Sequence, residues 1–332
     1  WQLAPHLPDG FGPVPDCGAR VRLPELAATL AALAEGGAKR FYTGAVAEAI
    51  CSVSWLEPED LAAMRPRWVE PLQASYHDHQ IVELPPPTQG VAVLEGLLLL
   101  AGTSGSFADR ITCCRLALED AQREVRDGAE VGHLLEPAAI VRRLGQRPAS
   151  IAEPAGGTIY LCVVDADGMA VSLVQSLYES FGSGVVAPGT GVALQNRGAC
   201  FAVEGGVTPG RRPYHTIIPG MIINDGQLLG PFGVMGGFIQ AQAHVQFLHS
   251  LLDDGVDPQT ALDRPRFRVE GERVLLEQGL WDSAAMISEL GLEPVRERAI
   301  GVFGGGQAIV RTPYGTLIGG SDGRKDGYAA GW

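Results

Sequence analysis

The chain has 332 residues, of which 46% are hydrophobic and 19% charged, a composition that fits a well-buried core and excludes a disordered chain. Its formal net charge of −13 argues against nucleic acid or an anionic membrane as partner, because phosphate binding requires clustered Lys and Arg. The longest apolar segment, Val91–Ala101, contains Glu95 and is shorter than the ~18 residues of a membrane helix. Residues 1–6 have neither the basic start nor the apolar core of a signal peptide. We expect a cytoplasmic protein.

Helical periodicity dominates the first half of the chain. Residues 1–20 are rich in proline and glycine and are expected to be irregular. Pro58 is expected in the first turn of a short helix, where its missing N–H costs nothing, and His77-Asp78 is expected at the tip of a hairpin. Residues 146–157 have no apolar period and are predicted to form an exposed linker. Further helices are predicted over 23–35, 44–53, 88–100 and 110–126, and the hairpin strands over 71–76 and 80–84.

The second half of the chain alternates between strands and helices. This order indicates a mixed α and β fold, which two packed sheets with helices outside them would accommodate. Strands are predicted over 158–165, 170–177, 192–194, 217–223, 231–234, 274–277, 307–311 and 316–319, and helices over 240–252, 258–263 and 283–290.

The six cysteines follow no pattern of ligands or disulfides. Cys113 and Cys114 are adjacent on a predicted helix and cannot form an ordinary bridge with each other, and no spacing matches a zinc motif. His77-Asp78-His79 falls at the predicted hairpin tip and is interpreted as a solvated turn. We therefore expect free buried thiols in a reducing compartment, with no metal and no cofactor. The cysteines are Cys17, Cys51, Cys113, Cys114, Cys162 and Cys200.

Thr158 lies at the junction of the predicted linker and an apolar strand that ends in a turn at Asp165–Gly168. A hydroxyl residue at the start of a buried strand, after a cleavable linker, suits an N-terminal nucleophile. Cleavage before it would release an α-amino group that can act as base for its own hydroxyl. The alternative is a structural threonine, because threonine favours strand geometry.

Further motifs follow in a fixed order along the chain. They are Phe41-Tyr42-Thr43-Gly44, Glu59-Asp60-Leu61, Leu84-Pro85-Pro86-Pro87-Thr88-Gln89-Gly90, Phe181-Gly182-Ser183-Gly184, Pro188-Gly189-Thr190-Gly191, Arg212-Pro213-Tyr214-His215-Thr216, Gly233-Val234-Met235-Gly236-Gly237, Arg264-Pro265-Arg266-Phe267 and Gly320-Ser321-Asp322-Gly323-Arg324. Together with the Thr158 strand, this set resembles the γ-glutamyltranspeptidase family over nearly the whole chain.

The resemblance implies an α+β fold, the four-layer αββα sandwich of N-terminal-nucleophile hydrolases. It implies that residues 1–157 are the later portion of a large subunit, whose first portion is not in this chain, and that residues 158–332 are the small catalytic subunit. The precursor is expected to cut itself between Gly157 and Thr158, after which the two subunits pair. No cofactor is implied.

Catalytic roles follow from the same resemblance. Thr158 matches the nucleophile and Ser176 the hydroxyl that hydrogen-bonds it, with a plain strand serine as the alternative. Gly236 and Gly237 match the glycines whose backbone N–H groups stabilise the oxyanion, a role that suits glycine because it lets donors approach closely.

The substrate-binding positions depart from the γ-glutamyl pattern. Arg197 replaces an amide or acid and Cys200 replaces an aspartate, so a cation stands where a substrate ammonium would bind. His215 and Thr216 replace paired serines, and Tyr178 stands where an asparagine is common. These departures resemble the acylase and amidohydrolase branches of the family, and Arg197 could take a substrate carboxylate as a bidentate partner; an exposed or structural salt bridge is its alternative.

The sequence therefore predicts an autoprocessing amidohydrolase that acts on the amide of a small acidic acyl group through a threonine acyl-enzyme. Its partner is a small-molecule amide, with no nucleic acid and no membrane. Two alternatives stay open. One is an authentic γ-glutamyl transferase or glutathione hydrolase, and the other is an inactive remnant with a structural or binding role.

Overall fold

The computed structural model describes residues 15–16, 18–149 and 157–332. The chain separates into two compact units, one formed by residues up to Trp68 together with 177–197, the other by 69–176 together with 198–332. The predicted boundary at 157/158 marks where the backbone would be cut and does not coincide with the boundary between these two units. That cut stays a prediction. Most of the predicted linker lies outside the described residues, and Gly157 is already the first residue of a strand.

The first unit is mainly helical. Pro58 occupies the first turn of its helix, as predicted, and a capping box joins Glu57 and Asp60 there. Thr29 donates from its hydroxyl to the carbonyl oxygen of Thr190 at 2.8 Å, which ties the first helix to the returning segment of the same unit. The elements are α1 (Pro24–Gly36), α2 (Lys39–Tyr42), α3 (Ala45–Ser52), α4 (Pro58–Ala63), β5 (Val186–Ala187) and β6 (Val192–Ala193).

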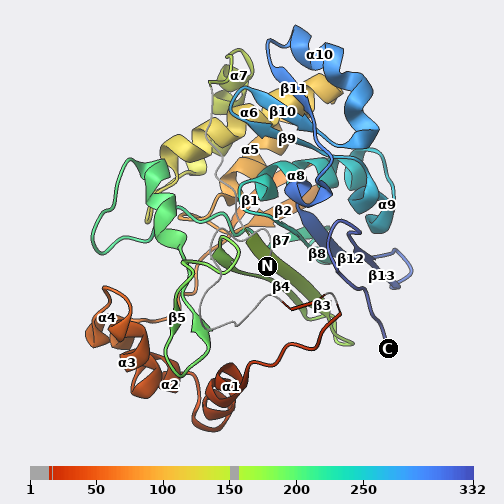
Figure 1. The fold of residues 1–332 in the computed structure, drawn as a ribbon. Helices are drawn as coiled ribbons and strands as arrows, with labels where there is room; N and C mark the ends of the chain where they lie inside the picture. Colours follow the sequence, from red (N-terminus) through yellow and green to blue (C-terminus); the bar gives the residue numbers. More distant parts are fainter. Residues whose placement is uncertain (1–14, 17, 150–156) are drawn as a thin grey trace. The chain divides into compact units, whose positions relative to one another are not determined.

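The second unit is built on a six-stranded antiparallel sheet in the order β1-β2-β7-β8-β12-β13 (Figure 1). The sheet joins two strands from before position 158 to four from after it, because β2 pairs with β7. The strands are β1 (Leu72–Tyr76), β2 (His79–Glu83), β7 (Gly220–Asn224), β8 (Gln227–Met235), β12 (Gly305–Arg311) and β13 (Leu317–Ser321).

Helices α5 (Gly90–Ala101) and α8 (Ile239–Leu248) are buried along almost their whole length and pack on this sheet, with α6 (Phe107–Glu124) against α5. A buried polar pair joins helix to sheet: His244 donates from Nδ1 to Glu83 at 2.8 Å and accepts the Val234 N–H at Nε2. Burial lowers the pKa of His244 to about 3 and raises that of Glu83, so both side chains are neutral in the core.

A second layer is formed by the hairpin of β3 (Gly157–Val164) and β4 (Ala170–Tyr178). Tyr160 points toward β8, where a Cβ at Gly233 would lie 2.3 Å from its ring. Contrary to the expectation of a buried strand, only one face of β3 is covered. Ile159 and Val163 on its other face are 55% and 51% exposed. Two sheets that face each other, with helices packed on the larger one, agree with the predicted α+β architecture.

Most predicted elements are confirmed, with differences at their ends. The helix predicted to Leu252 changes into a π-helical turn at His249–Asp253, and the strand predicted from Ile217 begins only at Gly220, after a proline. None of the helices in the described ranges combines the length and apolar composition needed to span a membrane. Elements not yet given are α7 (Pro137–Leu144), α9 (Pro258–Asp263), α10 (Ala284–Glu289), the sheet β9 (Phe267–Glu270), β10 (Arg273–Leu276) and β11 (Glu293–Arg296), and short helices at Gly132–Leu135, Arg197–Glu204, Gln278–Ser283 and Ile300–Phe303.

Candidate active site

A chain of hydrogen bonds runs through Thr158 to the peptide bond before it. Gln240 donates from Nε2 to Thr158 Oγ1 at 3.3 Å, and Thr158 Oγ1 donates to Ser176 Oγ at 3.3 Å. Ser176 Oγ in turn donates to the carbonyl oxygen of Gly157 at 2.6 Å. The hydroxyl predicted to be the nucleophile is thus linked, through the hydroxyl predicted to support it, to the carbonyl that self-cleavage would attack.

The β3–β4 hairpin places these two hydroxyls on one face. Thr158 and Tyr160 alternate with exposed Ile159, and Ser176 shares the inward face of β4 with Ser172. The hairpin turn is closed by Asp165, whose side chain accepts the backbone N–H groups of Asp167 and Met169. Because a slip of one residue would turn either hydroxyl outward, the turn helps to hold the geometry of the site.

Gly236 and Gly237 connect β8 to α8. Their φ values are +133° and +75°, and a Cβ at Gly236 would lie 2.7 Å from Ile239 Cγ2, so larger residues are strained here. The pair precedes the N-terminus of α8, where the helix dipole favours negative charge. The local backbone is therefore suited to hold an oxyanion, and the role of the two glycines stays a prediction.

Gln89, which the sequence analysis did not single out as a site residue, ties two predicted positions together. It is fully buried, and its Nε2 donates to the carbonyl oxygens of Thr216 at 2.9 Å and Gly237 at 3.3 Å. Its backbone N–H also donates to His215 O at 3.0 Å. His215 donates from Nδ1 to Pro213 O at 2.7 Å, since a carbonyl can only accept. The structure therefore brings the backbone of His215-Thr216 to the glycine pair.

Arg197 and Tyr178 belong to the first unit and contact each other. The Arg197 guanidinium lies over the Tyr178 ring, 4.6 Å from its centroid, and Arg197 is only 5% exposed. Tyr178 ends β4 with a φ of +77°. An exposed salt bridge at Arg197 is thus wrong, and the guanidinium is held as a stacked, buried group. Its place in the substrate pocket stays a prediction, as do those of Tyr178, His215 and Thr216.

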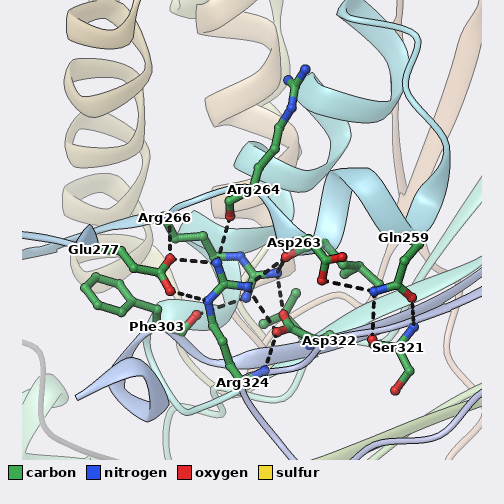
Figure 2. Close-up of polar contacts among 12 residues, drawn as sticks. Gln259, Asp263, Arg264, Arg266, Glu277, Phe303, Ser321, Asp322 and Arg324 are labelled. Atoms are coloured by element: carbon green, nitrogen blue, oxygen red, sulfur yellow. Dashed lines mark hydrogen bonds and ion pairs between the residues drawn. The ribbon is translucent and has the colours of Figure 1, made fainter. Parts of the chain in front are cut away.

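Figure 2 shows how the Arg266 and Asp322 motifs meet. Asp322 forms an ion pair with Arg266 at 2.7 Å and another with Arg324 at 3.0 Å. Asp322 Oδ2 also accepts the Gly306 N–H at 3.2 Å, next to the pairing of Gly305 with Met235. The network therefore holds β12 against the end of β8 that leads into the glycine pair.

No metal centre is evident within the described ranges, and two of the thiols there are unreactive. No group of three or more His, Cys, Asp or Glu side chains there is placed to hold a metal ion. Cys113 and Cys162 are free, and burial raises their pKa to about 12 and about 11, so both stay protonated. Cys17 lies outside the described residues.

Comparisons with known proteins cover almost the whole chain. A model of the γ-glutamyltranspeptidase family matches residues 6–332. The oxamate amidohydrolase proenzyme of Klebsiella pneumoniae is 33% identical over 97% of the chain, and the glutathione hydrolase-like YwrD proenzyme of Bacillus subtilis is 31% identical over 97%. The crystal structure of cephalosporin acylase from Bacillus halodurans superposes with a TM-score of 0.89 and 38% identity over 98% of the chain. The chain spans 67%, 68% and 66% of these three relatives, respectively.

Proposed function

Because the chain belongs to the γ-glutamyltranspeptidase family of N-terminal-nucleophile hydrolases, we propose that it is the catalytic part of a self-cleaving amidohydrolase. Its substrate would be the amide of a small acidic acyl group, and Thr158 would carry the acyl-enzyme. The observation that carries the proposal is the hydrogen-bond chain from Gln240 through Thr158 and Ser176 to the Gly157 carbonyl.

The same chain of bonds supplies a route for self-cleavage. Thr158 Oγ1 attacks the carbonyl carbon of Gly157 while its proton passes to Ser176 and the Ser176 proton passes to the Gly157 oxygen. The adduct then loses that proton and breaks its C–N bond as the Thr158 nitrogen gains a proton, which leaves an ester on Oγ1 and a free α-amino group. Water hydrolyses the ester to a Gly157 carboxylate and the free Thr158 hydroxyl.

In the processed enzyme the α-amino group of Thr158 would act as the base. It takes the Oγ1 proton as the hydroxyl attacks the substrate amide, and returns it to the leaving amine. The N–H groups of Gly236 and Gly237 would stabilise the oxyanion. Water then releases the acid in a second, equivalent step.

The two fragments would stay together after the cut. Residues His79–Val82 of β2, before Thr158, pair with Met221–Asn224 of β7, after it, in one continuous sheet. A cut at 157/158 breaks none of these sheet bonds, so we propose a large and a small fragment that remain paired. We also propose a cytoplasmic location, since the thiols of Cys51, Cys113 and Cys162 form no disulfide.

Substrate choice is inferred from the departures from the γ-glutamyl pattern. A buried, planar guanidinium at Arg197 suits a substrate carboxylate, and Cys200 offers no negative charge for an ammonium. Oxamate, which the Klebsiella relative is named for, is such a carboxylate-bearing amide. We therefore propose that glutaryl-like or oxamate-like amides are better substrates than γ-glutamyl amides.

Ser176→Ala is expected to lower turnover by one to two orders of magnitude, about 1.5 to 3 kcal/mol, because the nucleophile loses its hydroxyl partner. The rate is measured per molecule of cut protein, since self-cleavage should slow as well. Ser172→Ala is the matched control, because Ser172 lies on the same face of β4 but bonds to the Tyr160 hydroxyl. Equal rates for the two variants would return Ser176 to a structural role.

Arg197→Met is expected to raise KM for an acidic amide about tenfold or more, at least ~1.4 kcal/mol, with kcat little changed. Methionine keeps much of the side-chain volume over Tyr178, so a loss of packing is limited. A neutral acyl amide serves as control and should show no change in KM. A preference of the unmutated enzyme for γ-glutamyl amides, with Arg197→Met neutral, would favour the glutathione hydrolase alternative, which the name of the Bacillus subtilis relative suggests.

A further inference from the structure

Three buried glutamines on α8 differ in what their amides contact. Gln242 donates to Val269 O at 3.1 Å and accepts the Val269 N–H at 2.8 Å. Gln246 does the same with Phe267, donating at 3.0 Å and accepting at 3.0 Å. Both side chains therefore bind the backbone of β9, which explains why these two amides are buried.

Among the described residues, the Gln240 side chain bonds to no strand backbone of this kind. It is fully buried at the start of the helix, and its Nε2 donates to Thr158 Oγ1 at 3.3 Å. Its Oε1 is also buried, and within the described part of the chain no donor bonds to it. A buried acceptor without a donor is costly, so its presence beside the nucleophile calls for an explanation.

The uncut backbone explains why no donor from the described residues reaches Gln240 Oε1. In this structure the Thr158 nitrogen is part of a peptide bond and carries one hydrogen. Cleavage converts it into an amine with additional N–H donors. The O and N atoms of a side-chain amide are about 2 Å apart, so Gln240 Oε1 lies within roughly 6 Å of Thr158 Oγ1. The backbone nitrogen of Thr158 belongs to the same residue and is therefore close to Oε1 as well.

We propose that Gln240 is a positioning residue that holds Thr158 in two successive states. Before the cut its Nε2 donates to Oγ1 and orients the hydroxyl toward Ser176. After the cut its Oε1 accepts an N–H from the new α-amino group, which turns the amine lone pair toward Oγ1. This inference rests on the proposed function, because it needs Thr158 to become N-terminal.

A neutral amide is required for the second state. A carboxylate at position 240 would favour the protonated amine, and a protonated amine cannot act as base. Gln240→Glu should therefore raise the pKa of the Thr158 α-amino group by about one unit or more. The acidic limb of the kcat–pH profile should move upward by the same amount.

The experiment uses the complete protein and first establishes that the unmutated enzyme is cut before Thr158. The pKa of the Thr158 amine is then measured by the pH dependence of its labelling with acetic anhydride, read by mass spectrometry and independent of any substrate. Gln240→Met, which removes both amide atoms at similar volume, should slow self-cleavage and lower kcat about tenfold or more, with KM within about twofold. Gln246→Met is the matched control, expected to lower Tm but to leave the amine pKa unchanged.

The outcomes separate this inference from the proposed function. If the unmutated protein is never cut, both are overturned. If it is cut but Gln240→Glu leaves the amine pKa and the pH profile where they were, only the role of Gln240 is overturned. The same conclusion follows if Gln240→Met and Gln246→Met lower kcat equally.

Discussion

Replacing Thr158 with alanine will leave the precursor uncut and abolish amide hydrolysis. The reason is that one side chain supplies the nucleophile for both reactions, and Ser176 Oγ is engaged as a donor to the Gly157 carbonyl oxygen at 2.6 Å. Denaturing electrophoresis of the unmutated protein should show two fragments, with the smaller-subunit fragment beginning Thr-Ile-Tyr by N-terminal sequencing. The alanine variant should show one band.

Thr158→Ser is the control, because it keeps the hydroxyl and loses only a methyl group. It should still cut and hydrolyse, at a reduced rate. A single intact band from correctly folded unmutated protein would rule out self-cleavage and catalysis together, and would leave the inactive remnant as the interpretation of this chain.

Asp322→Ala is expected to lower the free energy of unfolding by about 3 to 5 kcal/mol, the usual cost of removing one partner from a buried ion pair. Arg266 is 2% exposed, and burial lowers the pKa of its guanidinium, an effect that the charge of Asp322 opposes. The alanine would also leave the Gly306 N–H without its acceptor. Urea unfolding followed by circular dichroism measures the change.

Asp263→Ala is the matched control, because Asp263 is an exposed carboxylate in the same region that bonds to Gln259. Its effect should stay within about 0.5 kcal/mol. If Asp322→Ala costs no more than this control, the ion-pair network does not hold β12 in place. If Asp322→Ala loses activity while its free energy of unfolding is unchanged, Asp322 would instead have a role in catalysis.

Local signals allowed much of the fold to be predicted. The helix at 258–263 was predicted to the residue, and the hairpin with His77-Asp78 at its tip follows from alternation and turn residues that neighbour each other in sequence. Thr158 and Ser176 were also predictable as a pair from their motifs, and the structure places their hydroxyls in contact. The short strands β9 and β11 were missed, because four residues carry too little pattern to separate strand from loop.

The family, the candidate nucleophile and the order of the elements can be predicted from the amino-acid sequence, since each rests on residues close together in the chain. The surroundings of Thr158 depend on how the chain packs in three dimensions. Gln240 reaches it across 82 positions, Gln89 reaches Gly237 across 148, and Arg197 proved to be stacked on Tyr178 and not exposed. Such contacts depend on which faces of the sheets and of α8 meet when they pack. In the sequence, a glutamine that hydrogen-bonds to a strand backbone cannot be told from one that hydrogen-bonds to a nucleophile.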